Sequence, residues 1–530
     1  AFTYAEANRR VDAVVRGLVA AGLRSGQKIG VMMKSRPSHL TIVTAINRLG
    51  GVAVLLSPET PDELLPRALE LGETDVLIVD PDSAARGVRA AAKVLVLGGV
   101  GESQWGRYAD SGIAGAGVKR RELSPGVVDL ESIDPDTVTL PAWYKPDAGR
   151  ARDLAMVFVF ASPHEPPRAM RVTNRRWAFS ALGAAAAATL TTRDTVYCCL
   201  PLHHPSGTLV AAGSALVGGS RLALASKFEP ETFWDEVRRY GVSIVYYAGE
   251  MCRRLVDAPP VLGEKNNPVR LFAGSGLRKD VWRQLVQRFG PVGVLELYAS
   301  TEANTVLANA RGKKIGSVGR PLPGSPEVAV AAWSFDTDDF LRDGTGHLLH
   351  ARLDEAGMLV ARLSQAAGAD VSHIDPRRLL RDAFAPGDLW FVTGDLMQVD
   401  VEGDYWFLDR QGQVIETKLG PVPSTRIEDA LYEVPCVALC VASADADDKR
   451  VPIATIQLGA ALDLDAINTV VAALPEYARP RTLRIVDSIP LTDGFRPIKR
   501  AASELPTREH FAWEPRAQRY VPGQSMSRAG

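Results

Sequence analysis

The segment VRLFAGSGLRKDVWRQLVQRFGPVGVLELYASTEAN, residues 269–304, says more about the fold of this chain than any other stretch. An apolar run at 269–273 leads into Gly274-Ser275-Gly276, and a helical stretch separates this turn from a second apolar run at 292–297. The second run ends in Tyr298-Ala299-Ser300-Thr301-Glu302. The pattern predicts strand, glycine turn, helix, strand and polar turn, which is the repeating unit of a parallel α/β sheet.

The two predicted turns are suited to ligand binding. In a parallel α/β sheet, ligands bind outside the carboxyl ends of strands, and glycine lets the backbone approach a planar ring or a phosphate. The second turn supplies an aromatic face from Tyr298, a hydroxyl from Thr301 and a carboxylate from Glu302, which suit a base, a phosphate oxygen and a divalent metal. A plain surface turn rich in small polar residues explains the same pattern. The segment alone leaves both interpretations open.

Other stretches place the chain in a family. The segment resembles the adenylate-forming (AMP-binding) acyl-CoA synthetase superfamily, and within it the branch of fatty-acid transport proteins and very-long-chain acyl-CoA synthetases. The resemblance extends over nearly the whole chain, through FTYAEANRRVDAVVRGLVAAGLRSGQKIGVMMKSRP at the start, PLHHPSGTLVAAGSALVGGSRLAL after residue 200, YYAGEMCRRL, TGDLMQVDVEGDYWFLDRQGQV and PRAQRYVPG near the end. The glycine turn, YASTEAN and TGD with its downstream DR are the specific elements.

Composition agrees with this placement. The chain has 530 residues, 46% of them hydrophobic, so it can bury several cores. Its formal charge is −1, from 61 basic and 62 acidic residues, which argues against nucleic acid or an anionic membrane as the main electrostatic partner. Five cysteines lie in apolar stretches without CxxC spacing and predict reduced, buried thiols and no zinc site. No run reaches the roughly 18 apolar residues of a membrane span. We expect a cytoplasmic protein with at most peripheral membrane contact.

Periodicity predicts the domain organisation. Residues 4–22 carry apolar positions at helical spacing, and short apolar strands follow at 28–33, 52–56, 76–79 and 94–97. The alternation predicts doubly wound α/β layers. By resemblance, residues 1–410 form a large domain of doubly wound α/β subdomains plus a distorted β-barrel, and residues 411–530 form a small α+β lid. The chain lacks an initiator Met and is expected to be part of a longer polypeptide, with an acyltransferase module as an upstream or partner domain.

The resemblance implies a two-step reaction that uses ATP, Mg²⁺ and coenzyme A. A fatty acid carboxylate first forms an acyl-adenylate and pyrophosphate, and a thiol then accepts the acyl group. Gly274, Ser275, Gly276 and Tyr298 occupy the positions expected to cradle and stack the adenine. Thr301 matches the contact to the α-phosphate and Glu302 the metal ligand, while Asp395 and Arg410 match the ribose-binding pair.

The acyl chain is expected to lie in a tunnel formed partly by small residues. His204, in Pro201-Leu202-His203-His204, matches an imidazole gate, although a single histidine after a strand is more often structural. Gly207 and the segment containing Tyr247 and Gly249 leave room for an alkyl chain. Core packing explains these small residues equally well.

The loop expected to bind the triphosphate departs from the family pattern. The family carries a Ser/Thr/Gly-rich loop that ends in lysine, whereas this chain reads ASPHEPPR at residues 161–168. The stretch has no glycine, three prolines that cannot donate, and the negative charge of Glu165. Arg168 can supply the charge of the missing lysine, but not the lost backbone NH groups.

The lid departs from the pattern as well. Gln413 aligns with a hinge aspartate, and Leu419-Gly420-Pro421 replaces the loop that helps to form the thiolation site. The adenylation lysine should lie in LTDGFRPIK, residues 491–499. Alignment places Arg496 there, and a shift of register places Lys499 there instead. Arginine keeps the charge but not the compact ammonium group.

Three functions follow from these observations. The chain is expected to be a fatty acyl-CoA ligase that activates medium to very long chains through an acyl-adenylate. The alternative is a catalytically impaired pseudo-ligase that binds an acyl or nucleotide ligand and serves a fused or partner acyltransferase in lipid synthesis, because the departures gather at the positions that handle phosphate. A scaffold appended to an acyltransferase is the third interpretation. Fold alone does not choose between them.

Overall fold

The computed structural model describes residues 2–98, 125–163, 165–300, 305–363 and 374–523. The chain divides into two compact units, residues 1–246 and 247–530. Helices and strands occur in both units, in agreement with the predicted mixed α/β fold class. The boundary between them falls inside strand β10 (Ile244–Ala248).

The first unit begins with a seven-stranded sheet in the order β5-β4-β3-β1-β2-β6-β7. All neighbours from β5 to β6 are parallel, and β7 is antiparallel to β6. The strands are β1 (Lys28–Met32), β2 (Val52–Leu56), β3 (Val76–Val79), β4 (Lys93–Val96), β5 (Val128–Asp129), β6 (Leu154–Ser162) and β7 (Glu165–Thr173). The four strands predicted from apolar runs are confirmed to within about a residue at each end.

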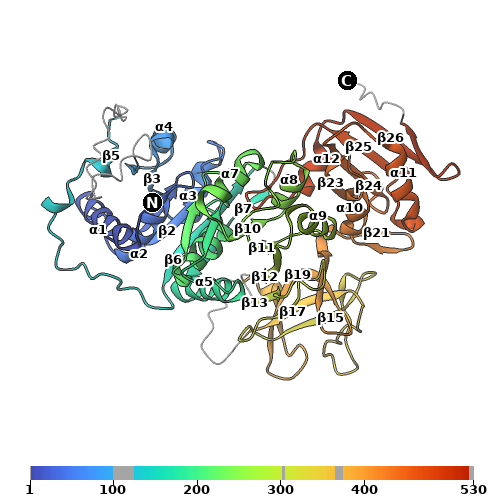
Figure 1. Cartoon of the computed structure of the whole chain (residues 1–530). Helices are drawn as coiled ribbons and strands as arrows, with labels where there is room; N and C mark the ends of the chain where they lie inside the picture. The colour runs from blue at the N-terminus through green and yellow to red at the C-terminus, as the bar shows by residue number, and fades with distance from the viewer. Residues whose placement is uncertain (1, 99–124, 164, 301–304, 364–373, 524–530) are drawn as a thin grey trace. The chain divides into compact units, whose positions relative to one another are not determined.

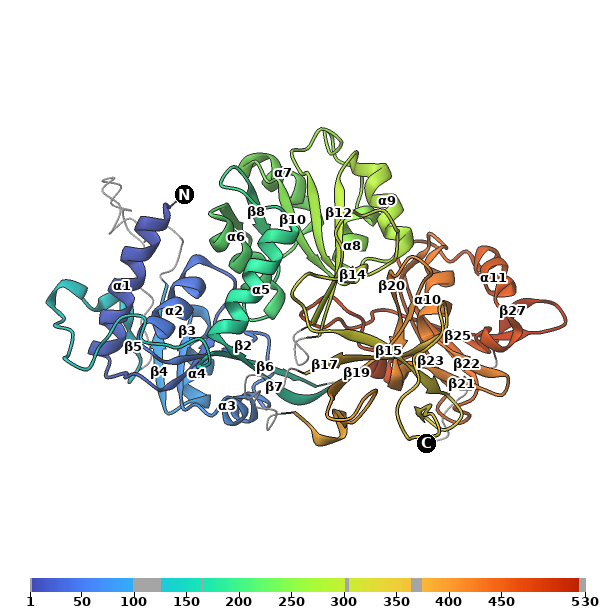
Figure 2. The ribbon, with the colours of Figure 1, turned by 90° about the horizontal axis from the view of Figure 1, so that it is seen from below.

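Helices cover both faces of this sheet because successive side chains of a strand point to opposite faces. Ala53 and Leu55 of β2 pack in one core with residues of α1 (Tyr4–Ala20) and α2 (Pro37–Arg48). Val54 and Leu56 pack in a second core with residues of α3 (Leu65–Gly72) and α4 (Ala84–Ala90). The doubly wound arrangement, seen from two sides in Figures 1 and 2, is therefore confirmed.

The rest of the first unit alternates helices and strands. The parallel strands β9 (Arg221–Leu224) and β10 flank β8 (Thr195–Cys198). The helices are α5 (Asn174–Ala187), the π-helix η5 (Ser206–Ala212), α6 (Gly213–Gly218) and α7 (Pro230–Tyr240). The alanine-rich run at residues 184–187 forms the C-terminal end of α5. No helix among the described residues is both long enough and apolar enough to cross a membrane.

The second unit starts with the segment that decides the fold. Strand β11 (Leu271–Ser275) lies parallel to β12 (Gly293–Ser300), and α9 (Lys279–Phe289) connects them. The predicted polar turn at Tyr298 begins too early, because β12 pairs antiparallel with β13 (Thr305–Asn309) as far as Ser300. Strand β14 (Arg320–Pro321) continues this sheet, and α8 (Met251–Asp257) follows β10.

A six-stranded antiparallel sheet follows within residues 1–410, the range of the large domain for which a distorted β-barrel was expected. Its strands are β15 (Val328–Ser334), β16 (Asp339–Phe340), β17 (Gly357–Arg362), β18 (Leu379–Arg381), β19 (Leu389–Val399) and β20 (Tyr405–Arg410). The register of β19 and β20 places Asp395 directly opposite Arg410.

The C-terminal residues form a smaller α+β core of their own. Five strands pair in the order β23-β24-β25-β26-β27, and the helix α10 packs on them. The elements are β21 (Ile415–Thr417), β22 (Gly420–Val422), α10 (Ser424–Tyr432), β23 (Val437–Ala444), β24 (Pro452–Leu458), α11 (Leu464–Ala473), β25 (Thr482–Val486), α12 (Lys499–Glu504), β26 (Glu509–Glu514) and β27 (Arg519–Pro522). The domain boundary at residue 410 stays a prediction.

All five cysteines are free and buried, as expected.

Candidate functional site

The predicted glycine turn packs tightly against the end of β10 and the turn that follows it. A Cβ on Gly274 would lie 2.1 Å from the carbonyl oxygen of Tyr247, so this position accepts only glycine. Gly276 has φ +95°, a conformation that side chains rarely adopt. The amide of Gly249 donates to the carbonyl of Ser275 at 2.9 Å. Two of the predicted ligand segments, residues 274–276 and 247–249, are therefore one local structure.

A buried carboxylate that was not among the predicted site residues, Glu296, holds this turn by hydrogen bonds. Glu296 of β12 is buried, and its side chain accepts from the amide of Gly276 at 2.6 Å, from the amide of Leu277 and from the Tyr247 hydroxyl. Burial raises the pKa of Glu296 to about 7, although these donors and the charge of Arg496 oppose the shift. The signal in the sequence is a single carboxylate between Leu295 and Leu297 in an apolar strand, which requires buried partners.

The raised pKa of Glu296 predicts a pH-dependent stability. The folded chain holds this proton more tightly than an unfolded carboxyl of pKa 4.5, so folding stability should fall by about 3 kcal/mol between pH 4.5 and 7. We expect Glu296→Gln to remove this dependence, as measured by urea unfolding at pH 5 and 8. Glu264→Gln is the control, because Arg288 lowers the pKa of Glu264 and its titration lies below this range. Equal pH dependence in wild type and Glu296→Gln would contradict the assignment.

Three residues predicted to bind the adenine and ribose meet at one place. The Tyr298 hydroxyl donates to Asp395 Oδ2 at 2.6 Å, and Arg410 Nε lies 3.7 Å from Asp395 Oδ1. Burial raises the pKa of Asp395, and the Tyr298 hydroxyl and Arg410 counteract this shift. The Asp395 side chain is 17% exposed and that of Arg410 55% exposed, so a ligand can reach this pair.

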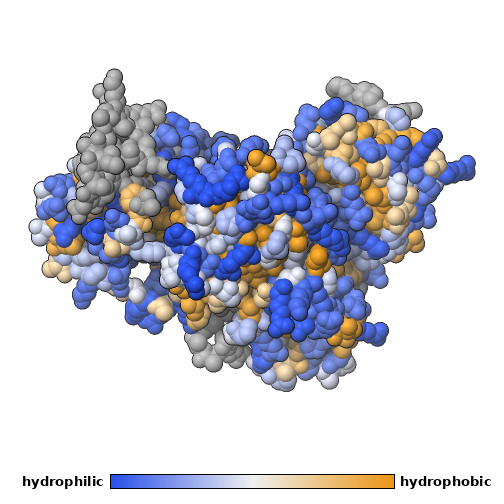
Figure 3. Space-filling model, in the orientation of Figure 1, coloured by the Kyte–Doolittle hydropathy of each residue, from blue (hydrophilic) through white to orange (hydrophobic). Residues whose placement is uncertain are grey.

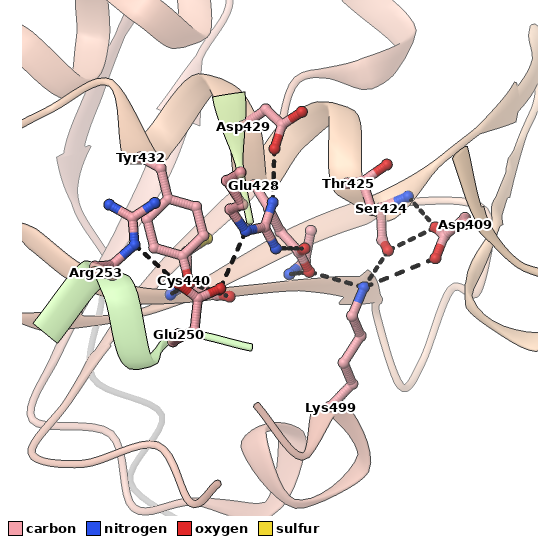
Figure 4. A network of polar contacts seen from close by, with 12 residues as sticks. Glu250, Arg253, Asp409, Ser424, Thr425, Glu428, Asp429, Tyr432, Cys440 and Lys499 are labelled. Atoms are coloured by element: carbon pink, nitrogen blue, oxygen red, sulfur yellow. Dashed lines mark hydrogen bonds and ion pairs between the residues drawn. The ribbon is translucent and has the colours of Figure 1, made fainter. Parts of the chain in front are cut away.

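The structure separates the two candidate cations near the C-terminus. Arg496 Nη2 lies 3.4 Å from Ser275 Oγ, so its guanidinium reaches the glycine turn. Lys499 instead lies in a buried cluster, where its ammonium is 2.8 Å from Glu428 Oε1 and 3.9 Å from Asp409 Oδ1 and donates to Ser424 Oγ (Figure 4). The sequence could not choose between them, because the difference comes from contacts with distant segments.

The same buried cluster contains two arginines. Arg278, the residue before α9, contacts Glu428 at 2.7 Å, Asp429 at 2.6 Å and Glu250 at 3.2 Å. Arg253 of α8 contacts Glu250 and Asp280, both at 2.9 Å. Both guanidinium groups lie over the ring of Tyr432, whose position beside Arg253 and Glu250 is seen in Figure 4. The cluster links residues 250–280 with α10.

In the first unit, the altered phosphate loop forms a tight hairpin. Strands β6 and β7 pair antiparallel as far as Ser162 and Glu165, so the backbone groups of these residues are used for pairing between the two strands. Arg168 lies over the ring of Phe160 at 4.0 Å, and Phe160 makes an edge contact with His204 at 5.9 Å. The structure thus brings together two predicted site residues, Arg168 and His204. Their roles stay predictions.

Gly207 lies in the π-helix η5, where a Cβ would be 2.2 Å from the carbonyl oxygen of Pro201. Close packing therefore explains this glycine without a tunnel.

Thr301 and Glu302 lie outside the described residues, so the predicted phosphate and metal contacts have no structural account. Among the described residues no cluster of acidic, His or Cys side chains is suited to a metal ion.

Comparison with known proteins decides the family. The AMP-binding enzyme family matches residues 1–155 and 166–345, and the AMP-binding enzyme C-terminal domain matches residues 426–495. The chain belongs to the AMP-binding enzyme family. The match is interrupted at residues 156–165, where the loop has become a hairpin.

Curated relatives support the predicted branch. The medium/long-chain-fatty-acid–CoA ligase FadD6 of Mycobacterium tuberculosis is 30% identical over 94% of this chain and 80% of its own length. The long-chain fatty acid transport protein 2 of Rattus norvegicus is 27% identical over 93% of this chain and 80% of its own length. This AMP-binding chain is thus acyl-CoA ligase-like, and the predicted superfamily and branch are confirmed.

Solved structures of similar fold confirm the fold class. ATP-bound MatB from Rhodopseudomonas palustris superposes with a TM-score of 0.72 at 21% identity, over 94% of this chain and 93% of that protein. The O-succinylbenzoate coenzyme A synthetase MenE from Bacillus subtilis, in complex with AMP, gives a TM-score of 0.70 at 19% identity, over 94% of this chain and 92% of that protein.

Proposed function

We propose that this chain activates a medium to very long chain fatty acid with ATP and transfers it to coenzyme A. In the first step a carboxylate oxygen attacks the α-phosphorus, the bond to the β-phosphate oxygen breaks, and pyrophosphate leaves. In the second step the coenzyme A thiolate attacks the acyl carbonyl, and AMP leaves. The observation that carries the proposal is the assembly of the glycine turn, Tyr298, Asp395, Arg410 and Arg496 in one unit.

Each of these groups has a place in the first step. By resemblance, the Tyr298 ring and the glycine turn would bind adenine, and the partly exposed Asp395–Arg410 pair can accept from and donate to ribose hydroxyls. The Arg496 guanidinium beside Ser275 supplies positive charge where negative charge develops on phosphate. Lys499 is assigned a structural role, because its ammonium is held by Glu428 and Asp409. Mg²⁺ would be held through Glu302, by family resemblance.

One observation favours the second candidate function, a pseudo-ligase that binds ligand without turnover. A loop that wraps a triphosphate needs free backbone NH groups, and here the ladder of β6 and β7 occupies that stretch. Arg168 can supply charge from this hairpin, but it lies over Phe160. A pseudo-ligase of this kind would present its ligand to a fused or partner acyltransferase, at a cytoplasmic or peripheral membrane site.

Pyrophosphate release separates the two functions. The purified chain is expected to release pyrophosphate with ATP, Mg²⁺ and a fatty acid of its preferred length, and to form acyl-CoA when coenzyme A is added. Tyr298→Phe is expected to raise the KM for ATP several-fold, because it removes the hydrogen bond to Asp395. Binding of ATP or fatty acid by calorimetry without any pyrophosphate release would replace the ligase by the pseudo-ligase. Absence of both binding and release would contradict both functions.

A further inference from the structure

The segment that carries Arg496 is a tight hairpin. Leu491 and Pro497 form an isolated bridge, and the Thr492 amide donates to the Arg496 carbonyl at 2.8 Å. Phe495 has φ +57°, in the left-handed region. Residues 491–497 therefore form a short, closed hairpin. The Arg496 side chain extends from its second strand.

This hairpin docks on the turn that follows β10. The amide of Glu250 donates to the carbonyl of Phe495 at 2.8 Å. A Cβ on Gly249 would lie 2.4 Å from the same carbonyl oxygen and 2.6 Å from that of Gly494. Gly249 also donates to Ser275. The docked position of the hairpin is thus what brings Arg496 within reach of the glycine turn.

One side chain links the docking turn with the C-terminal domain. Arg278 contacts Glu250, whose amide holds the hairpin, and also contacts Glu428 and Asp429 of α10. Glu428 in turn binds Lys499, which begins α12 three residues after Arg496 (Figure 4). The Glu250 and Glu428 side chains are 5% and 1% exposed, and that of Arg278 17% exposed, so water screens these contacts little.

We propose that Arg278 is a positioning residue for adenylation: it clamps α10 to the Glu250 turn and so holds Arg496 at the glycine turn. The proposal rests on the proposed function of Arg496, but the docking itself does not. A guanidinium suits this role because its planar fork reaches three carboxylates at once, which a lysine ammonium on one flexible stem does not. The hairpin undocks more readily when the clamp is weakened.

Hydrogen exchange at the Glu250 amide measures docking without any reaction. In Arg278→Gln we expect this amide to exchange on the order of tenfold faster than in wild type, because its bond to Phe495 opens more often. Arg278→Lys keeps the charge and is expected to give an intermediate rate. Arg288→Gln is the matched control: Arg288 is a similarly buried arginine of α9 that pairs with Glu264 and not with α10.

A second pair of variants tests the docking surface. Gly249→Ala places a methyl group against Phe495 and should speed exchange at Glu250 as Arg278→Gln does. Gly241→Ala is its control, because Gly241 has a similar φ of +59° and no atom within 4 Å of the added Cβ. Unchanged exchange at Glu250 in both Arg278 variants, relative to Arg288→Gln, overturns the proposal.

Activity separates this proposal from the proposed function. In a chain that adenylates, Arg278→Gln should lower pyrophosphate release at least about tenfold, while transfer of the acyl group from added acyl-adenylate to coenzyme A changes less. Equal loss in both half-reactions overturns the positioning role. If the wild type releases no pyrophosphate, the proposed function fails, and faster exchange in Arg278→Gln still supports the clamp.

Discussion

Replacement of Arg496 by alanine is expected to lower the rate of pyrophosphate release about 100-fold or more, with little change in folding stability. The guanidinium is the cation that the structure brings to the glycine turn, at 3.4 Å from Ser275 Oγ. Loss of a single group that stabilises developing charge typically costs about two to three orders of magnitude in rate. The rate is measured with ATP, Mg²⁺ and a fatty acid at saturation.

Three further variants define the role of Arg496. Arg496→Lys introduces the residue that the family resemblance leads us to expect at this position, and it should retain more activity than Arg496→Ala because it keeps the charge. Arg500→Ala, at an exposed arginine of the same segment, should behave like wild type. Lys499→Ala should lower stability through Glu428 and Asp409. If Arg496→Ala releases pyrophosphate at the wild-type rate while a folded Lys499→Ala does not, then Lys499 is the cation that acts in adenylation and Arg496 is not.

Local patterns in the sequence predicted the doubly wound α/β layers, whereas the β-barrel and the small C-terminal domain were expected only from the family resemblance. The apolar runs that form β1 to β4 are short and contain β-branched residues, and segments with helical spacing separate them. The local strand preference of these residues therefore agrees with their burial in the sheet. The end of β12 was predicted too early. Tyr298 and Ser300 look like turn residues, but pairing with Leu307 and Thr305 keeps them in the strand. A tertiary contact thus overrides the local signal.

The candidate site was predictable where motifs carry it. Tyr298, Asp395 and Arg410 come from motifs that are far apart in sequence, and the fold brings their side chains into contact. Their roles in binding adenine and ribose stay predictions. The position of Glu296 in an apolar strand indicates that it needs buried partners, but the sequence does not say which residues these are, and Arg278 before a helix carries no such signal. Those partners, Gly276 and Glu428, belong to segments 20 and 150 residues away.

The buried cluster around Glu428 predicts the largest effect on stability. Glu428→Gln removes the carboxylate that pairs with both Arg278 and Lys499, and we expect a loss of about 3–5 kcal/mol, because two cations remain buried without a full partner. Asp429→Asn is the matched control. Asp429 is the next residue and pairs with the same Arg278, but its side chain is 49% exposed, so its loss should cost about 1 kcal/mol or less.

Urea unfolding at several pH values measures both effects. Burial opposes the ionisation of Glu428, but Lys499 and Arg278 outweigh it and lower the pKa of this carboxyl. A carboxyl with a lowered pKa in the folded state contributes stability above its unfolded pKa and loses it as the pH falls through the folded pKa. The difference in the free energy of unfolding between wild type and Glu428→Gln should therefore be largest at neutral pH and become smaller in acid. Equal losses in Glu428→Gln and Asp429→Asn would mean that burial does not set the strength of these ion pairs, and that the cluster does not clamp α10 through Glu428.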